Sequence, residues 1–254
     1  MSGSGVAMEE IRFPSGRSAH LVRCPPRGCA RNALDVLKVA VGRPVVVVNG
    51  GTSTFEPVLE RDLTEAMDVI ATVAVHEGVT LVTGGTDAGV FAHLGQALGR
   101  AGGNYQCVGV APIGRTTWPG PEHECFDRDR VPLEVHHTHF VLVEGSDWGD
   151  ETPTMLEVTG LLADSEPSVG VLAGGGEIAA EEVHGHLLAR RPVIVLAGSG
   201  RLADRVVEAL RRGTPVPLGT DVQEHRELLE VVELDDPLTT LAASLRDRLR
   251  RKRS

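Results

Sequence analysis

The chain has 254 residues, of which 41% are hydrophobic, and this is enough to bury the core of one large domain or two small ones. Its formal net charge of −10 argues against a protein that binds nucleic acid non-specifically, because such affinity comes mainly from cations that neutralise phosphates. No apolar run approaches the ~20 residues needed to cross a bilayer, and the first residues lack the basic-then-apolar pattern of a secretion signal. We therefore expect a cytoplasmic protein with no membrane span and no nucleic-acid partner.

From Pro44 onward, short apolar runs rich in valine and isoleucine alternate with glycine-rich breaks and with segments of helical periodicity. The expected strands are residues 44–49, 79–83, 107–112, 139–144, 168–173 and 192–197. The expected helices are residues 60–76, 88–100, 154–163, 178–190 and 201–211. This alternation is typical of βαβ units, and strands that are apolar almost throughout are covered by helices on both faces. The sequence therefore predicts an α/β fold with a mostly parallel sheet.

The whole chain, residues 1–254, is predicted to form a single domain. Residues 1–43 are an N-terminal extension packed on it, with a short strand near 20–24 and a helix over 33–39, and residues 237–254 are a C-terminal helix and basic tail. A solvated helix end is the simpler interpretation of the tail, RDRLRRKRS. The longest break, residues 115–138, contains three prolines. Loops of that length inside a domain are usually functional, and we expect this one to close over a ligand.

Glycines are concentrated after the predicted strands, in NGGTSTF, GGTDAGV, IGR, GGGEIAAEE and GSGR. In an open parallel sheet, ligands bind outside the carboxyl ends of the strands, where glycine lets the backbone approach a ligand and helix N-termini favour phosphate. No loop matches GxGxxG or contains the GKS or GKT of a P-loop, which argues against a standard dehydrogenase and a P-loop NTPase. The candidate ligand-binding residues on these loops are Gly50, Gly51, Thr52, Gly84, Gly85, Thr86, Asp87, Gly114, Arg115, Gly175, Gly176, Gly198, Ser199, Gly200 and Arg201.

Several of these residues also have a purely structural interpretation. A glycine after a strand is often only a tight turn, and Asp87, Thr52 and Thr86 can cap the following helix as readily as they bind a ribose hydroxyl. Arg201 opens a helix after two glycines, which suits bidentate contact with phosphate, but a solvated surface arginine is the alternative. Ser199 lacks the GxSxG context of a nucleophile.

Six ordered motifs resemble a known family: NGGTSTF, LVTGGTDAGVFAHLGQAL, VGVAPIG, LEVHHTHFVLVEG, VLAGGGEIAAEEV and PVIVLAGSGRLADRV. They are similar to the N-terminal SLOG-type homology region of TRPM channels, and more closely to its free-standing prokaryotic relatives, over residues 12–214. The resemblance implies a Rossmann-like three-layer αβα sandwich. It also implies a nucleotide ligand such as ADP-ribose, with no further cofactor required, and it places Arg201 where the family has a phosphate- or ribose-binding arginine.

The same superfamily contains the LOG phosphoribohydrolases, whose pattern PGGxGTxxE ends in a glutamate that assists cleavage between base and ribose phosphate. We match Gly175, Gly176 and Glu181 to this pattern, which makes Glu181 the candidate catalytic residue. Ile178 replaces the third glycine and Ala179 the threonine, which adds bulk and removes a hydroxyl donor. Glu181 as an exposed helix residue beside Glu182 is the alternative, so ligand binding without turnover is favoured over hydrolysis.

The histidines and tryptophans leave alternatives open. The segment HHTHF and the pair His184 and His186 invite a metal site, but no acidic or cysteine ligand follows at a recognised spacing, so no metal is expected. Contact between a nucleotide and His139, or His136, is the better reading. Trp118 and Trp148 lie in irregular segments and either stack on a base or cover the core. The four cysteines form no CxxC pair, and we expect reduced thiols.

Three functional hypotheses follow. The first is a cytoplasmic SLOG-type sensor that binds an ADP-ribose-like or other NAD-derived nucleotide, and the second is a LOG-like hydrolase that releases free base from a nucleoside 5′-monophosphate. The third is an interaction protein that binds no nucleotide. A homodimer is expected from the resemblance alone, and the sequence does not identify a downstream effector.

Overall fold

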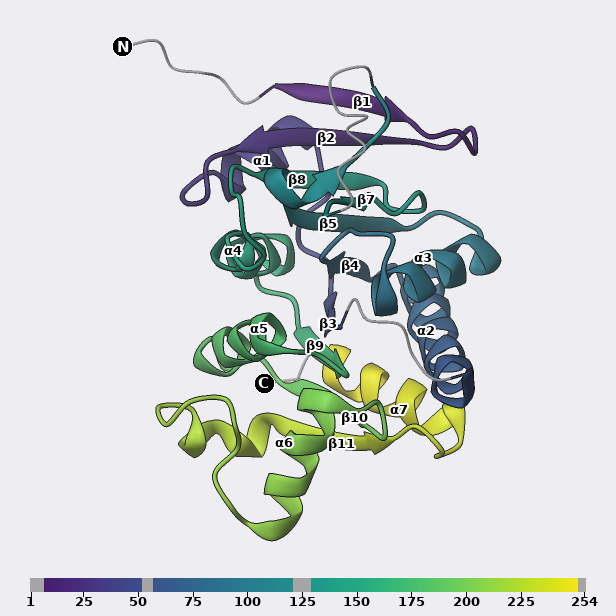
Figure 1. Ribbon diagram of the computed structural model, residues 1–254. Helices are drawn as coiled ribbons and strands as arrows, with labels where there is room; N and C mark the ends of the chain where they lie inside the picture. Colours follow the sequence, from purple (N-terminus) through teal and green to yellow (C-terminus); the bar gives the residue numbers. More distant parts are fainter. Residues whose placement is uncertain (1–6, 52–56, 121–128, 251–254) are drawn as a thin grey trace.

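The computed structural model describes residues 7–51, 57–120 and 129–250. Its centre is a nine-stranded sheet with the order β1-β2-β8-β5-β4-β3-β9-β10-β11 (Figure 1). Within the described residues every neighbouring pair in this sheet is parallel, except that β1 runs antiparallel to β2. The strands are β1 (Met8–Arg12), β2 (Ser18–Cys24), β3 (Val45–Gly50), β4 (Thr80–Thr83), β5 (Gln106–Pro112), β8 (His139–Val143), β9 (Ser168–Ala173), β10 (Val193–Ala197) and β11 (Leu229–Glu233).

Helices cover both faces of the sheet and lie on its two sides in Figure 1. One face packs against α2 (Pro57–Glu77), α3 (Gly89–Ala101) and α7 (Leu238–Leu249). The other packs against α1 (Ala30–Leu37), α4 (Thr152–Ala163), α5 (Glu177–Leu188) and α6 (Arg201–Arg212), and a 3-10 turn, η2 (Gln223–Leu228), leads into β11. Both faces of the central strands are thereby buried, which explains their continuous apolar sequence. The predicted α/β fold, a Rossmann-like three-layer αβα sandwich, is confirmed.

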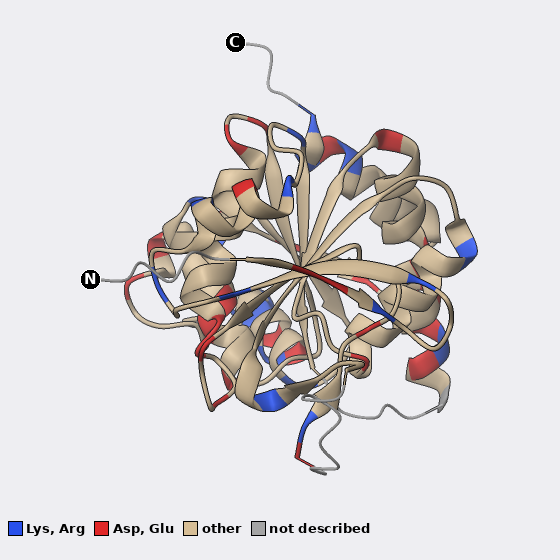
Figure 2. Ribbon diagram, turned by 90° about the horizontal axis from the view of Figure 1, so that it is seen from above, with Lys and Arg blue, Asp and Glu red and all other residues tan. Residues whose placement is uncertain are grey.

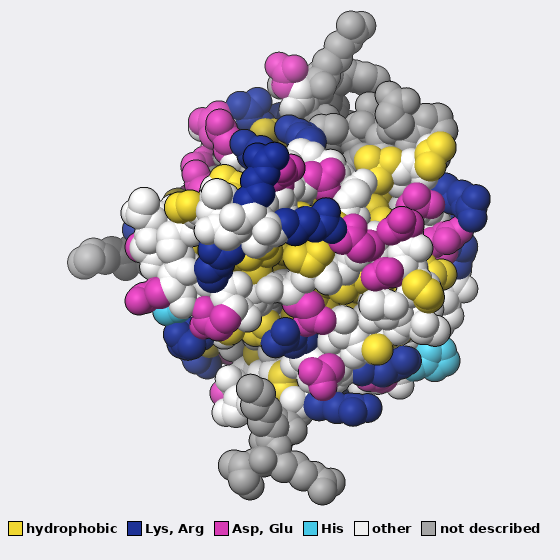
Figure 3. Space-filling view, turned by 90° about the horizontal axis from the view of Figure 1, so that it is seen from below, with side chains coloured by type: hydrophobic (Ala, Val, Ile, Leu, Met, Phe, Trp, Pro, Cys, Tyr) yellow, Lys and Arg dark blue, Asp and Glu magenta, His cyan; other side chains and the backbone are white. Residues whose placement is uncertain are grey.

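Charged side chains lie mostly on the helices and loops around this core. Figure 2, seen from the β1 end, shows charged residues on β1 in front and around the periphery, while the inner strands behind are uncharged. On the face at the β11 end, shown in Figure 3, cations and anions are interspersed, with no large area of one sign. No helix in the described part of the chain combines the length and apolar character needed to cross a membrane.

The N-terminal extension is part of the sheet. β2 pairs in parallel with β8, and β1 forms the outer edge. Between β2 and α1, Cys24 and Cys29 form a disulfide, with their Cα atoms 6.0 Å apart. This differs from the expected reduced thiols, because the turn after β2 brings the two cysteines together although they are not a CxxC pair. Cys107 is a buried free thiol, and Cys125 lies outside the described residues.

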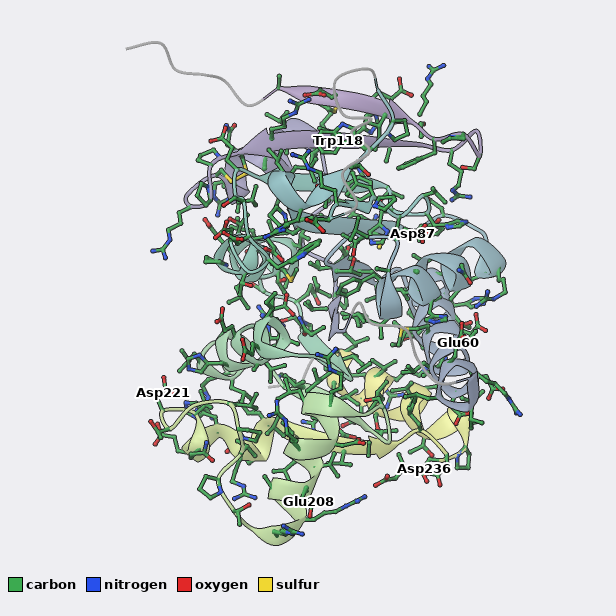
Figure 4. All side chains as sticks on the ribbon, viewed as in Figure 1. Glu60, Asp87, Trp118, Glu208, Asp221 and Asp236 are labelled. Atoms are coloured by element: carbon green, nitrogen blue, oxygen red, sulfur yellow. A yellow bond between two sulfur atoms is a disulfide. The ribbon has the colours of Figure 1, made fainter. Side chains whose placement is uncertain are left out.

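The long segment after β5 folds back on the sheet. A 3-10 turn, η1 (Ile113–Arg115), precedes β6 (Thr116–Thr117), which pairs with β7 (Val131–Pro132). Leu133 then forms a β-bridge with Thr86, and Trp118 packs in the core beside β1 and β2 (Figure 4). Residues 121–128 lie outside the described part of the chain, so closure of this loop over a ligand stays a prediction.

The strand order contains a switch point between β3 and β9. From β3 the chain continues through α2 to β4 and then β5 on one side, whereas β9 is followed by β10 and β11 on the other. The loops after β3 and β9 therefore diverge to opposite faces and leave a crevice at the carboxyl ends of these strands. In open α/β sheets this is where ligands bind.

Candidate functional site

A cavity opens at this switch point, at the carboxyl ends of β3, β4 and β9. The cavity has a volume of about 180 Å³, smaller than the roughly 300–1,000 Å³ of most small-molecule sites. Its residues come from the loops after the three strands, the loop before α4 and the first residues of α3, α5 and α6. The cavity is lined by Gly50, Gly51, Gly84, Thr86, Phe91, Trp148, Glu151, Gly176, Ile178, Ala179, Glu182 and Arg201.

The guanidinium group of Arg201 extends across two of these loops. A Cβ atom placed on Gly51 would lie 3.5 Å from Nη1, and one placed on Gly176 would lie 3.4 Å from Nη2. The backbone of Arg201 is itself left-handed, with φ at 53°. Such a conformation is strained by about 1–3 kcal/mol in a residue with a side chain and is concentrated at functional sites. The arrangement holds a planar cation in the cavity wall, where it can bind a phosphate bidentately.

The amino end of α5 adds to this positive wall. The helix begins at Glu177 with Gly176 as its N-cap, and no side chain among the described residues caps it. Its first residues, Ile178 and Ala179, line the cavity. Backbone N–H groups at a helix start have a partial positive charge and favour an anion. Arg201 and the start of α5 together therefore form an anion-binding wall.

Thr86 presents a hydroxyl group with no partner. Its side chain is fully buried and lines the cavity, and Oγ1 has no hydrogen-bond partner among the described residues. The adjacent backbone is fixed, because the N–H of Glu134 donates to the carbonyl of Gly85 at 2.9 Å and that of Asp87 to the carbonyl of Pro132 at 2.7 Å. A buried polar group left without a hydrogen bond costs about 1–3 kcal/mol. A ligand that contacts Thr86 would recover this free energy.

Two buried glutamates also line the cavity. Glu182 on α5 accepts a hydrogen bond from Nδ2 of Asn49 at 2.9 Å, and Glu151 at the start of α4 accepts one from the N–H of Gly149 at 2.8 Å. Burial raises the pKa of Glu182 to about 8, and the nearby charge of Glu151 adds to this shift. Burial likewise raises the pKa of Glu151 to about 7. Carboxyl groups with such values exchange protons near neutral pH, as general acids and bases do.

Trp148 supplies an aromatic surface. It lies half-buried on the loop between β8 and α4 and lines the cavity, whereas Trp118 is 5% exposed and belongs to the core. The carboxylate of Asp150 accepts hydrogen bonds from the backbone N–H groups of Ser146 and Asp147, at 3.0 and 3.1 Å, and so holds this loop. Of the two tryptophans, Trp148 is therefore the one that can stack on a base.

Comparison with known proteins assigns the family. A family model described as "SLOG in TRPM, prokaryote" matches residues 43–242, which include every residue that lines the cavity. The chain belongs to this SLOG family. Over 204 residues it is 28% identical to the transient receptor potential cation channel subfamily M member 4 of Rattus norvegicus. That alignment covers 65% of this chain and 16% of the channel, so the chain matches a small part of its relative.

A crystal structure of a structural-genomics target, TM1055, has the same fold. It superposes with a TM-score of 0.51 and 21% sequence identity, covering 81% of this chain and 99% of the other. At this identity the likeness supports the SLOG fold and not a shared activity.

Six of the residues that the sequence predicts for the SLOG site line the cavity: Gly50, Gly51, Gly84, Thr86, Gly176 and Arg201. Five more lie on the loops that follow β4, β9 and β10 and do not line the cavity: Gly85, Gly175, Gly198, Ser199 and Gly200. A Cβ atom on Gly85 would lie 2.8 Å from Cα of Gly109, and one on Gly175 would lie 2.8 Å from Cβ of Ala179. The Ser199 hydroxyl accepts a hydrogen bond from the N–H of Gly174 and donates one to the carbonyl of Leu196, which is a structural role.

Other predicted residues lie away from the cavity lining. Asp87 is exposed, and the N-cap of α3 is Ala88, with no side chain in a capping hydrogen bond (Figure 4). A Cβ atom on Gly114 would lie 2.6 Å from the carbonyl oxygen of Gly145, so this glycine admits the Trp148 loop. Arg115 forms an ion pair with Asp147 at 2.7 Å, which braces the same loop. His139 is the first residue of β8 and lies at the amino ends of the strands, whereas the cavity is at their carboxyl ends. Thr52 lies outside the described residues.

The candidate catalytic residue also changes place. Glu181 is exposed on α5 and does not line the cavity, whereas the adjacent Glu182 is 4% exposed and does. Counting the LOG pattern without gaps from Gly175 and Gly176 puts its final glutamate on Glu182, so matching it to Glu181 was one residue out. The sequence therefore contained the signal for Glu182. No comparable signal marked Glu151 or Asn49.

Three of the histidines belong to networks with other acidic residues. His136 and His137 both bind the carboxylate of Glu134, at 2.7 and 2.9 Å, and His184 pairs with Asp221 at 3.0 Å. Over residues 7–51, 57–120 and 129–250, no group of three or more His, Cys, Asp or Glu side chains is arranged to hold a metal ion.

Proposed function

We propose that this SLOG protein binds a nucleotide in the cavity and acts as a sensor of an ADP-ribose-like or other NAD-derived ligand. The observation that supports this most directly is the Arg201 guanidinium over Gly51 and Gly176, beside the start of α5, which no side chain of the described residues caps. A planar cation and the N–H groups of a helix start, at a sheet's switch point, suit a phosphate. We therefore place the phosphate of the ligand there.

The remaining lining residues suit the rest of a nucleotide. The hydroxyl of Thr86 and the carboxyl groups of Glu151 and Glu182 can exchange hydrogen bonds with ribose hydroxyls. Trp148 can stack on a base, an interaction of about 1–3 kcal/mol. The cytoplasmic location, the homodimer and an effector that reads the bound state stay predictions.

Isothermal titration calorimetry against ADP-ribose, cyclic ADP-ribose, NAD, AMP and ATP tests the proposal. We expect saturable binding of one intact nucleotide, weakened about 10- to 150-fold by Arg201→Ala, since a hydrogen bond to a charged group contributes about 1.5–3 kcal/mol. Arg205→Ala is the matched control, because Arg205 is exposed on the same helix and does not line the cavity. No binding of any nucleotide, or equal loss of affinity in both variants, would contradict the proposal.

Hydrolysis of a nucleoside 5′-monophosphate is the second candidate, favoured by the raised pKa of Glu182. A protonated Glu182 can give its proton to the departing base as the C1′–N bond breaks. The oxygen of a water molecule then bonds to C1′, and its released proton passes to the Glu151 carboxylate. The products are free base and ribose 5-phosphate.

Chromatography of the nucleotides recovered from the titration separates the two functions. Free base that disappears in Glu182→Gln, but persists in Glu181→Gln, would establish the hydrolase. Intact nucleotide with all three proteins would favour the sensor.

A further inference from the structure

A line of four buried side chains runs beneath α5 from the amino edge of the sheet to the cavity. Arg191, between α5 and β10, donates from Nε to Oγ of Ser168 at 2.8 Å and from Nη1 to Nδ1 of His186 at 2.6 Å. Nε2 of His186 lies 3.0 Å from Oδ1 of Asn49, and Nδ2 of Asn49 lies 2.9 Å from Oε2 of Glu182. All four members are at most 7% exposed.

The hydrogen bonds in this line have only one consistent direction. A guanidinium group donates and never accepts, so Nδ1 of His186 must accept from Arg191. The single proton of the neutral imidazole is then on Nε2, which donates to Oδ1 of Asn49. The Asn49 amide is thereby oriented with its NH₂ group toward Glu182. Arg191 thus sets the direction of a hydrogen bond three side chains away.

His186 keeps this role across the physiological pH range. Burial and the positive charge of Arg191 lower the pKa of His186 well below its ordinary value, so the ring stays neutral. At the other end, Oε2 of Glu182 accepts from Asn49, which favours the proton on Oε1 because a carbonyl oxygen is a stronger acceptor than a hydroxyl oxygen. Glu182 lines the cavity, and the acidic groups that act on it are Glu151 and Glu181.

The sheet leaves space for the line. Gly170 is in the middle of β9, where a Cβ atom would lie 3.1 Å from Cδ2 of His186 and 3.5 Å from Oδ1 of Asn49. A larger residue at this position would crowd both members.

We propose that Arg191, His186 and Asn49 are positioning residues that keep the proton of Glu182 on Oε1, toward a bound nucleotide. The proposal rests on the proposed function, because it assumes that the ligand of this cavity meets Glu182. The line supplies what burial alone does not, which is a choice between the two carboxyl oxygens.

The tautomer of His186 is a direct test that is made on the wild-type protein and needs no nucleotide to bind. ¹⁵N NMR of the histidine side chains of the wild-type protein, with the His186 signal assigned by its loss in His186→Gln, should show a proton on Nε2 and none on Nδ1. A proton on Nδ1 would overturn the proposal.

The second test follows the titration of Glu182 by ¹³C NMR of its carboxyl carbon, assigned by loss of the signal in Glu182→Gln. In Arg191→Met, His186 can move its proton to Nδ1 and Asn49 can turn its carbonyl oxygen toward Glu182. Glu182 then loses a hydrogen bond to its charged form, and its pKa should rise by about one unit. His186→Phe should do the same, His186→Gln should restore much of the wild-type value, and the control His184→Phe should leave it unchanged.

The outcomes distinguish this proposal from the proposed function. An unchanged pKa of Glu182 in folded Arg191→Met and His186→Phe would overturn the positioning role even if nucleotides bind. A raised pKa of Glu182 in these variants of a protein that binds no nucleotide would support the positioning role of Arg191 and His186 and refute the sensor.

Discussion

Glu182→Gln keeps the shape of the side chain and an acceptor for the Asn49 amide but removes the ionisable group. Burial raises the pKa of Glu182 from an ordinary 4.5 to about 8 in the folded protein. Because the folded state holds this proton more tightly than the unfolded state, ionisation of Glu182 destabilises the folded protein. The free energy of unfolding therefore falls as the pH rises from 4.5 to about 8. At about 1.4 kcal/mol per pKa unit, the loss is about 3 kcal/mol at pH 7 and about 5 kcal/mol at pH 9. The glutamine variant, which does not ionise, should escape it.

Urea unfolding of the wild-type protein and the variant at pH 5, 7 and 9 measures this effect. Glu182→Gln should differ from the wild type by less than about 1 kcal/mol at pH 5 and be about 3 kcal/mol more stable at pH 7. In thermal unfolding the gain at pH 7 corresponds to about 6–12 °C in Tm. Glu181→Gln, on the exposed neighbour, should show no such pH dependence. A stability difference that does not grow between pH 5 and pH 9 would refute the reasoning.

Two further substitutions test the site and the packing near it. Thr86→Val replaces a buried hydroxyl that lacks a partner among the described residues, so the melting temperature should stay the same or rise. Calorimetry should show a nucleotide affinity lower by about 2- to 10-fold. An unchanged affinity would show that Thr86 does not contact the ligand. A Cβ atom on Gly95 would overlap the carboxyl group of Glu134, so Gly95→Ala should lower the free energy of unfolding by about 1–3 kcal/mol. Gly160→Ala, with open space around it, should not lower it. Equal urea midpoints for the two variants would contradict the close contact between Gly95 and Glu134.

The strands that the sequence predicts are those with two neighbours in the sheet. Residues 168–173 are predicted and observed as β9, four other predicted strands differ from the structure by one residue at one end, and β3 is displaced by one residue at both ends. Burial on both faces demands continuous apolar runs, which are easy to detect. The outer strands β1, MEEIR, and β11, LEVVE, escaped prediction because an edge strand with a partly exposed face contains charged residues.

The site was only partly predictable for a similar reason. Glycine after a strand indicates the correct edge of the sheet, and Arg201 follows from its place at a helix start. Trp148 and Glu151 come from a loop whose position depends on packing between Arg115, Asp147 and Asp150, and no sequence pattern specifies that arrangement.

The departures from the LOG pattern affect the two halves of the cavity differently. Ile178 and Ala179 stand where that pattern has glycine and threonine, and both line the wall that would hold the phosphate. Arg201, from another loop, reaches the same wall and supplies a charge that backbone and hydroxyl donors lack. Glu182 meanwhile keeps the pattern's carboxyl group and is held by Asn49 and His186. Because phosphate contact depends on Arg201 and proton transfer on Glu182, Arg201→Ala should weaken binding and Glu182→Gln should abolish any release of free base, so the two residues separate the two functions.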